Sequence, residues 1–175
     1  MNWKYYAPYI RSENTFGRCD PTPIFENPKV FHNLIKDMLK PFNKNKFNKI
    51  AAIDALGFII GSVIAYQTKK PLVLIRKAGK LPYSKQFLVS DNFVDYTRMK
   101  KSFEMKRDSI NKRDKVLLVD EWIETGTQAR SAIKLIERLN GKVVGIAALK
   151  VHINDNTKIL FDKYNCKPIR SSELR

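Results

Sequence analysis

The chain has 175 residues, of which 43% are hydrophobic, and it carries a net charge of +16. This length and hydrophobic content suit one globular domain with a buried core, so we expect residues 1–175 to form a single domain. The absence of a long apolar run argues against a membrane-spanning helix, and the few cysteines and histidines form no zinc-site pattern.

The charge and the cysteines bear on partners and compartment. A Lys- and Asn-rich composition spread over a solvated surface explains the positive charge, and we favour this interpretation. Nucleic acid binding is the alternative, because Lys and Arg neutralise backbone phosphates whatever the base sequence. The first residues lack the apolar segment of a signal peptide, so we expect a cytoplasmic protein with reduced thiols and no membrane attachment.

Alternating helix and strand patterns predict an α/β fold. Asn27 is placed to cap a helix that begins at Pro28, and Asn140-Gly141 ends a later one. Such alternation implies a central, mostly parallel sheet with helices on both faces. The predicted elements are helix 28–39, strand 49–53, helix 58–67, strand 72–75, possible short strands 87–89 and 103–105, strand 116–119, helix 127–139, strand 142–150, helix 157–164 and a short strand near Ile169.

Three of the predicted strands end in a charged residue. Asp54, Arg76 and Asp120 each follow an apolar run of strand length. Ligands of parallel sheets bind at the carboxyl ends of the strands. We therefore expect these three side chains to lie at one ligand site.

The stretch from Lys115 to Arg130 carries the strongest functional signal. Its apolar run fits a buried parallel strand, which delivers Asp120 and Glu121, and the turn at 124–128 leads into a helix. Backbone N–H groups at such a turn, helped by Thr hydroxyls, form a phosphate cradle, whereas the acids suit sugar hydroxyls or a Mg2+ ion shared with the ligand. The alternative is a buried strand with solvated acids and an ordinary capped helix.

This stretch resembles the phosphoribosyl pyrophosphate signature of the type I phosphoribosyltransferases, which joins an apolar run, two acids and a Thr-Gly turn. Other segments resemble adenine phosphoribosyltransferases and stand in the family's order: Asp20-Pro21-Thr22-Pro23, Asp54-Ala55-Leu56-Gly57-Phe58 and Ile75-Arg76-Lys77-Ala78-Gly79-Lys80-Leu81-Pro82. The resemblance implies the type I phosphoribosyltransferase fold, with a mobile loop or hood. It also implies transfer of phosphoribosyl from phosphoribosyl pyrophosphate to a purine base, with adenine favoured, in purine salvage.

Residue roles follow from the resemblance alone. The acid pair Asp120 and Glu121 would hold the ribose hydroxyls, directly or through Mg2+, and these two residues are the implied metal ligands. Arg76 and Lys80 would face the pyrophosphate, although a surface basic cluster is the alternative. The 5'-phosphate loop would be Thr125, Gly126, Thr127 and Gln128, and the pyrophosphate loop would be Asp54, Ala55, Leu56 and Gly57.

Two further acids could act on the base. Glu124 stands where adenine enzymes usually carry a small residue and hypoxanthine–guanine enzymes carry Asp, so it could serve as a general base; a helix N-terminal acid is the alternative. Asp95-Tyr96 resembles the Glu-Tyr pair of the mobile loop in adenine enzymes. Residues 77–112 are polar and mixed, and we interpret them as a flexible catalytic loop that closes over substrate.

The chain departs from the family pattern, and these departures leave alternatives open. Leu56 replaces the usual Arg of the pyrophosphate loop, so Lys77 or Lys85 would have to supply that contact. Either Arg18 or Cys19 falls where an adenine-contacting Arg is expected. The alternatives are a hypoxanthine, guanine or xanthine enzyme, or a non-catalytic protein on the same fold that senses phosphoribosyl pyrophosphate or binds nucleic acid. A homodimer is implied by the resemblance alone.

Overall fold

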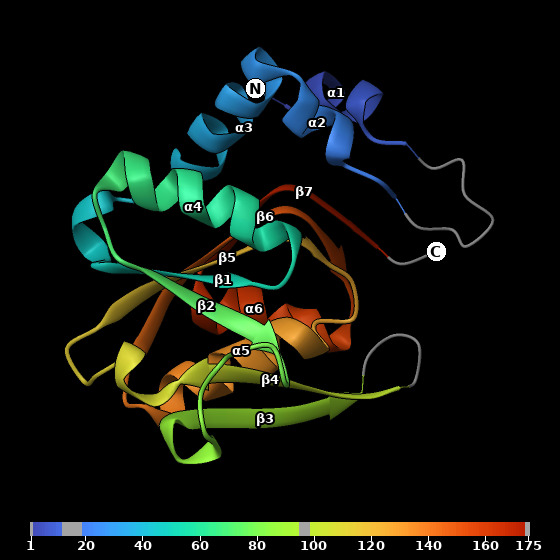
Figure 1. The fold of residues 1–175 in the computed structure, drawn as a ribbon. Helices are drawn as coiled ribbons and strands as arrows, with labels where there is room; N and C mark the ends of the chain where they lie inside the picture. Colours follow the sequence, from blue (N-terminus) through green and yellow to red (C-terminus); the bar gives the residue numbers. More distant parts are fainter. Residues whose placement is uncertain (1, 12–18, 95–98, 174–175) are drawn as a thin grey trace.

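The computed structural model describes residues 2–11, 19–94 and 99–173. Its centre is a seven-stranded sheet in the order β3-β4-β2-β1-β5-β6-β7 (Figure 1). The strands are β1 (Lys49–Ile53), β2 (Leu72–Lys77), β3 (Leu88–Val94), β4 (Lys100–Lys106), β5 (Lys115–Ile123), β6 (Lys142–Ile153) and β7 (Cys166–Glu173). The α-helices are α1 (Trp3–Tyr6), α2 (Thr22–Glu26), α3 (Pro28–Leu39), α4 (Leu56–Thr68), α5 (Thr127–Arg138) and α6 (Asp155–Tyr164).

The sheet is mostly parallel, as the sequence predicts. β1 lies between β2 and β5 and runs parallel to both, and β6 and β7 extend the parallel part beyond β5. β4 pairs antiparallel with β2 and with β3, so these two strands form an antiparallel edge. All the parallel strands therefore present their carboxyl ends at the same edge of the sheet.

Helices cover both faces of the sheet. α3 and α4 lie over one face, and α5 and α6 lie over the other (Figure 1). Successive residues of a strand point to opposite faces, so Leu117 packs in the core under α3 and α4 while Leu118 packs in the core under α5 and α6. Both side chains are fully buried, which explains why the β5 sequence is apolar without alternation.

Most predicted elements are confirmed, with shifted ends. The Asn27 side chain accepts hydrogen bonds from the backbone N–H groups of Lys29 and Val30, which fixes the start of α3. β5 extends to Ile123, beyond the predicted end at Val119. The added residues pair with β6, where Trp122 lies opposite Lys150, and this pairing places the acid pair within the strand.

The segment 77–112 contains two strands longer than the sequence predicts. In β3 and β4, Val89 pairs with Met105 and Asp91 with Phe103, and all four side chains are buried. The buried Asp91 carboxylate forms an ion pair of 2.8 Å with Arg138 of α5. Because Asp91 is charged and yet lies on the buried face, the alternation of apolar and polar residues expected of a strand is interrupted in the sequence of β3. Motion of this segment over a substrate stays a prediction.

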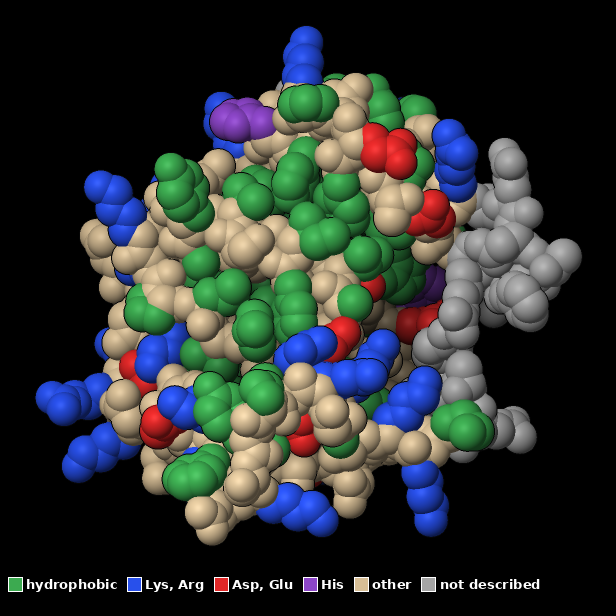
Figure 2. Space-filling view, viewed as in Figure 1, with side chains coloured by type: hydrophobic (Ala, Val, Ile, Leu, Met, Phe, Trp, Pro, Cys, Tyr) green, Lys and Arg blue, Asp and Glu red, His purple; other side chains and the backbone are tan. Residues whose placement is uncertain are grey.

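Lys and Arg side chains are spread around the face seen in Figure 2 and are not confined to one area of it. This distribution supports the solvated-surface interpretation of the net charge of +16. Within the described ranges, no helix is both long enough and apolar enough to span a membrane.

Candidate active site

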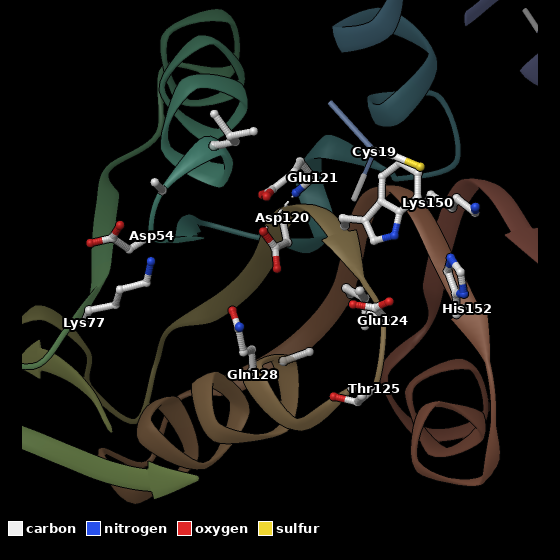
Figure 3. A pocket seen from close by; sticks show the side chains of 16 residues that line it. Cys19, Asp54, Lys77, Asp120, Glu121, Glu124, Thr125, Gln128, Lys150 and His152 are labelled. Carbon is white, nitrogen blue, oxygen red and sulfur yellow. Dashed lines mark hydrogen bonds between the residues drawn. The ribbon is translucent and has the colours of Figure 1, made fainter. Parts of the chain in front are cut away.

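A cleft of about 430 Å³ opens at the carboxyl ends of the parallel strands. Its walls come from residues 54–56 after β1, Lys77 at the end of β2, residues 120–126 of β5 and its loop, and Lys150 and His152 of β6 (Figure 3). Parallel neighbours bring these ends together, as the position of Asp54 and Asp120 after apolar runs predicts.

The acid pair lies in the middle of the cleft. Asp120 is only 4% exposed, and its carboxylate accepts a hydrogen bond of 2.9 Å from the backbone N–H of Glu121. Burial, and after it the neighbouring charge of Glu121, raises the pKa of Asp120 well above its usual range. Gly57 makes this packing possible, because a Cβ there would lie 3.2 Å from Asp120 Oδ1 and 3.1 Å from the Val119 carbonyl oxygen.

The acid pair suits a divalent cation. The Glu121 Oε2 atom is buried and has no hydrogen-bond partner among the described residues. Carboxylates are ligands that Mg2+ prefers, and Mg2+ usually takes only one or two of them from the protein. The described part of the chain contains no group of three metal-ligating side chains, so an ion bound to Asp120 and Glu121 would need further oxygens from substrate and water.

The loop between β5 and α5 is open toward the cleft. Gly126 has φ of 79°, a left-handed conformation that favours glycine, and a Cβ there would lie 2.9 Å from Thr157 Cγ2. The hydroxyl oxygens of Thr125 and Thr127 are 3.0 Å apart. Gly126 is also the N-cap of α5 and offers no side chain to its first N–H groups, so the helix start can accept an anion.

Asn154 attaches this loop to the neighbouring helix. Its side-chain oxygen caps α6 by accepting from the N–H groups of Asn156 and Thr157, at 3.0 and 3.2 Å. Its side-chain N–H₂ donates to the backbone carbonyl of Glu124 at 2.8 Å. One amide thus fixes both the start of α6 and the start of the loop. The sequence analysis did not identify Asn154.

The loop after β1 begins with a cis peptide bond between Asp54 and Ala55. Arg76 Nε lies 3.4 Å from Asp54 Oδ2, and Arg76 also donates to the backbone carbonyl of Lys80 at 3.0 Å. Its guanidinium carbon lies 6.0 Å from the centre of the Phe58 ring. Arg76 therefore supports Asp54 from behind and does not itself line the cleft. Contact of Arg76 or Lys80 with pyrophosphate stays a prediction.

Leu56 and Lys77 both line the cleft. Leu56 brings an apolar side chain to the position where the family usually has Arg. Lys77 lies beside Asp54 on the neighbouring strand, and its amine points toward the loop that follows β1 (Figure 3). Of the two lysines that could replace the missing Arg, Lys77 lines the cleft and Lys85 does not.

The end of the cleft farthest from Asp54 has an aromatic and basic wall, of which the sequence analysis did not identify Lys150 and His152 (Figure 3). Lys150 Nζ lies 4.5 Å from the centre of the Trp122 ring and 5.9 Å from that of Trp3. The His152 ring is 6.0 Å from Trp122, and burial, followed by the charge of Lys150, lowers the pKa of His152 below its ordinary value. The register of β5 with β6 brings Trp122, Lys150 and His152 together, and no local sequence pattern predicts this register.

Most predicted site residues lie in or next to the cleft. Three that are not in its lining contact residues that are: Gly57 packs on Asp120, Arg76 on Asp54, and Thr127 on Thr125. Lys80 does not line the cleft, and its backbone carbonyl accepts a hydrogen bond from Arg76. Asp95 and Arg18 lie outside the described residues. The predicted residues that line the cleft are Cys19, Asp54, Ala55, Leu56, Lys77, Asp120, Glu121, Glu124, Thr125, Gly126 and Gln128.

Comparison with known proteins gives a consistent result. The profile of the phosphoribosyl transferase domain family matches residues 23–173. An adenine phosphoribosyltransferase of Cereibacter sphaeroides is 41% identical over 152 residues, which cover 84% of this chain and 83% of that protein. One from Dinoroseobacter shibae is 39% identical over 130 residues, covering 74% of this chain and 70% of that protein.

Solved structures agree with the sequence comparison. The crystal structure of adenine phosphoribosyltransferase from Thermoanaerobacter pseudethanolicus superimposes with a TM-score of 0.85 at 29% identity, covering 97% of this chain and 98% of that one. This chain therefore belongs to the phosphoribosyltransferase family. It is an enzyme of the pentosyltransferase class, which confirms the resemblance seen in the sequence.

Proposed function

We propose that the protein transfers the phosphoribosyl group of phosphoribosyl pyrophosphate to adenine, giving adenosine monophosphate and pyrophosphate in purine salvage. A bond forms between a ring nitrogen of the base and the anomeric carbon. The bond from that carbon to pyrophosphate breaks, and pyrophosphate leaves with the electron pair. The observation that carries the proposal is one cleft that joins the buried acid pair, an open anion-binding helix start and the loop at Asp54, in a chain 41% identical to an adenine enzyme.

The 5'-phosphate would bind at the start of α5. The backbone N–H groups after Gly126 and the hydroxyls of Thr125 and Thr127 would donate to its oxygens. Gln128 also lines the cleft and adds a side-chain amide. This anchor fixes the sugar relative to the acid pair a few residues upstream, and such positioning supplies much of the catalysis in a transfer of this kind.

The pyrophosphate would lie between the loop after β1 and Lys77. Asp54 is held by Arg76, and the exposed backbone of Ala55 faces the cleft beside it. The Lys77 ammonium would neutralise charge that develops on the leaving group. Its position supports the role that the usual Arg would have at Leu56.

The acid pair would hold the ribose hydroxyls and Mg2+. When bound, the ion would supply positive charge that neutralises the pyrophosphate. The unpaired Glu121 oxygen supports this role, because it is free to bind an ion. The raised pKa of Asp120 also supports it, because burial disfavours the ionised acid and an adjacent cation would favour it. Glu124 would accept the proton that the base loses, with Asp95 as a further acid from the segment 77–112.

We also propose that the enzyme is a cytoplasmic homodimer. On α4, Ile59 and Tyr66 share one face and are 39% and 86% exposed, and Leu74 of the adjacent β2 is 37% exposed. Figure 2 shows hydrophobic side chains gathered in the middle of this face. An apolar surface of this kind favours association. Sedimentation at micromolar concentration should give twice the chain mass of 20.3 kDa, and a single-chain mass would contradict the dimer.

A panel of nucleobases tests the proposed activity. Purified protein is incubated with Mg2+, phosphoribosyl pyrophosphate and adenine, hypoxanthine, guanine or xanthine in turn, and pyrophosphate and nucleotide are quantified. We expect equal amounts of both products, with adenine giving the largest kcat/KM. Pyrophosphate release no greater than in the protein-free control with every base would contradict the proposal.

A further inference from the structure

Glu124, the residue that follows β5, and His152 of β6 stand at the same end of the cleft (Figure 3). The last paired residues of these two strands are Trp122 with Lys150 and Ile123 with Val151, so Glu124 and His152 are the next residues along each chain. Both line the cleft, and the Glu124 charge acts on the His152 ring.

The hydrogen-bonding capacity of His152 is not used within the protein. Both ring nitrogens, Nδ1 and Nε2, are buried and have no hydrogen-bond partner among the described residues. A buried polar atom without a partner is costly, and in a binding site the ligand commonly supplies the partner. The lowered pKa means that the ring is neutral near pH 7, so it has one N–H donor and one acceptor nitrogen.

The position of this pair identifies the part of the substrate that it faces. The loop at Asp54, the acid pair and the start of α5 are assigned to pyrophosphate, ribose and 5'-phosphate, and His152 lies at the opposite end from Asp54 and Lys77 (Figure 3). The purine base is the second substrate, and it is the one reactant to which no part of the cleft has yet been assigned. Trp122 packs against both His152 and Lys150, and together these side chains close this end of the cleft.

We propose that His152, together with Glu124, holds the base by hydrogen bonding to a purine edge that carries a donor beside an acceptor, and so favours purines with an exocyclic group at this edge over unsubstituted purine. This inference rests on the proposed function for the position of the sugar. Adenine has an amino group beside a ring nitrogen, so it can hydrogen bond to both His152 and Glu124. A 6-oxopurine also offers a donor beside an acceptor and can form the same hydrogen bonds. Purine without an exocyclic group leaves the His152 nitrogens and the Glu124 carboxylate unsatisfied.

Substitutions that keep or remove these groups test the inference. His152→Leu removes donor and acceptor, whereas His152→Gln keeps one of each and serves as the matched control. Glu124→Ala tests the second member of the pair if His152→Leu fails to fold. We expect the ratio of kcat/KM for adenine over unsubstituted purine to fall about tenfold in His152→Leu, the equivalent of one hydrogen bond, and to recover largely in His152→Gln. The KM for phosphoribosyl pyrophosphate should move much less.

A binding measurement separates this inference from the proposed activity. Calorimetry compares adenosine monophosphate with the purine riboside monophosphate that lacks the amino group, in wild type and each variant, without turnover. If wild type binds the former more tightly and His152→Leu loses that preference, the inference stands even if no base yields pyrophosphate. A preference that is absent in wild type, or unchanged in both His152→Leu and Glu124→Ala, overturns it.

Discussion

The side-chain amide of Asn154 donates a hydrogen bond of 2.8 Å to the backbone carbonyl of Glu124, and this bond joins the start of α6 to the loop between β5 and α5. The same side chain caps α6 with its oxygen. The cap of α6 and the attachment of the loop thus depend on two different atoms of one residue. This separation allows the two contributions to be measured independently.

Asn154→Ala and Asn154→Asp should differ in a defined way. Asp keeps an acceptor for the cap but cannot donate to Glu124, so its Tm should stay near that of wild type while the KM for phosphoribosyl pyrophosphate rises severalfold. Ala loses both contacts, and the lost cap should cost about 1 kcal/mol, which lowers Tm by about 2–4 °C in a protein of this size. Thermal unfolding and steady-state kinetics check both. An Asn154→Asp enzyme with wild-type KM would show that the bond to Glu124 has no role in binding.

The double substitution Asp120→Asn with Glu121→Gln should abolish turnover without unfolding the protein. Both changes preserve shape, and burial, which raises the pKa of Asp120, disfavours its ionised form in the unliganded protein, so Tm should be unchanged or slightly higher. Pyrophosphate release and a melting curve in parallel test this expectation. Activity equal to that of wild type would remove the acid pair from the mechanism.

Gly126→Ala should impair both stability and phosphate binding. The residue has φ of 79°, and a new Cβ would lie 2.9 Å from Thr157 Cγ2, so backbone strain and a clash add together. Gly79→Ala is the matched control, because Gly79 has φ of 77° with nothing within 4 Å of a Cβ. We expect a loss of about 1 kcal/mol at Gly79 and roughly twice that at Gly126, with weaker substrate binding at Gly126 alone. Equal urea midpoints for the two variants would contradict the packing argument.

His152 should make stability depend on pH. Its pKa in the folded protein lies below the ordinary value of 6.5, so the unfolded chain binds more protons as the pH falls below that value. The stability that His152 contributes is therefore complete above that pH and is lost toward acid. Urea midpoints at about pH 7.5 and about pH 5.5 should fall more for wild type than for His152→Gln, which does not titrate there. An equal fall in the two proteins would refute the lowered pKa.

The sequence could predict the parts of the fold that depend on local pattern. The Asn27 cap, the apolar β5 run and the presence of Asp120 in the site are all local signals, and the structure has each of them, although β5 continues past Asp120 to Ile123. α1 and α2 were missed because they have only four and five residues, too few for a helical period. β3 was underestimated because Asp91 is stabilised by Arg138, which is distant in the sequence.

The site was predictable only where one segment carries it. The loop between β5 and α5 and the acid pair are contiguous in the sequence, so a motif could identify them. Lys150 and His152 become part of the cleft because β6 lies in register with β5, and Trp122 faces them across the strands. The support that Arg76 gives to Asp54 likewise depends on a parallel pairing of two strands.

A crystal structure of the protein with Mg2+ and phosphoribosyl pyrophosphate tests the central claim most directly. We expect the 5'-phosphate to lie against the N–H groups that follow Gly126, the ribose hydroxyls and the ion beside Asp120 and Glu121, and the pyrophosphate near Asp54 and Lys77. A sugar phosphate bound outside this cleft, or a loop after β5 closed onto its own side chains when ligand is saturating, would contradict the assignment.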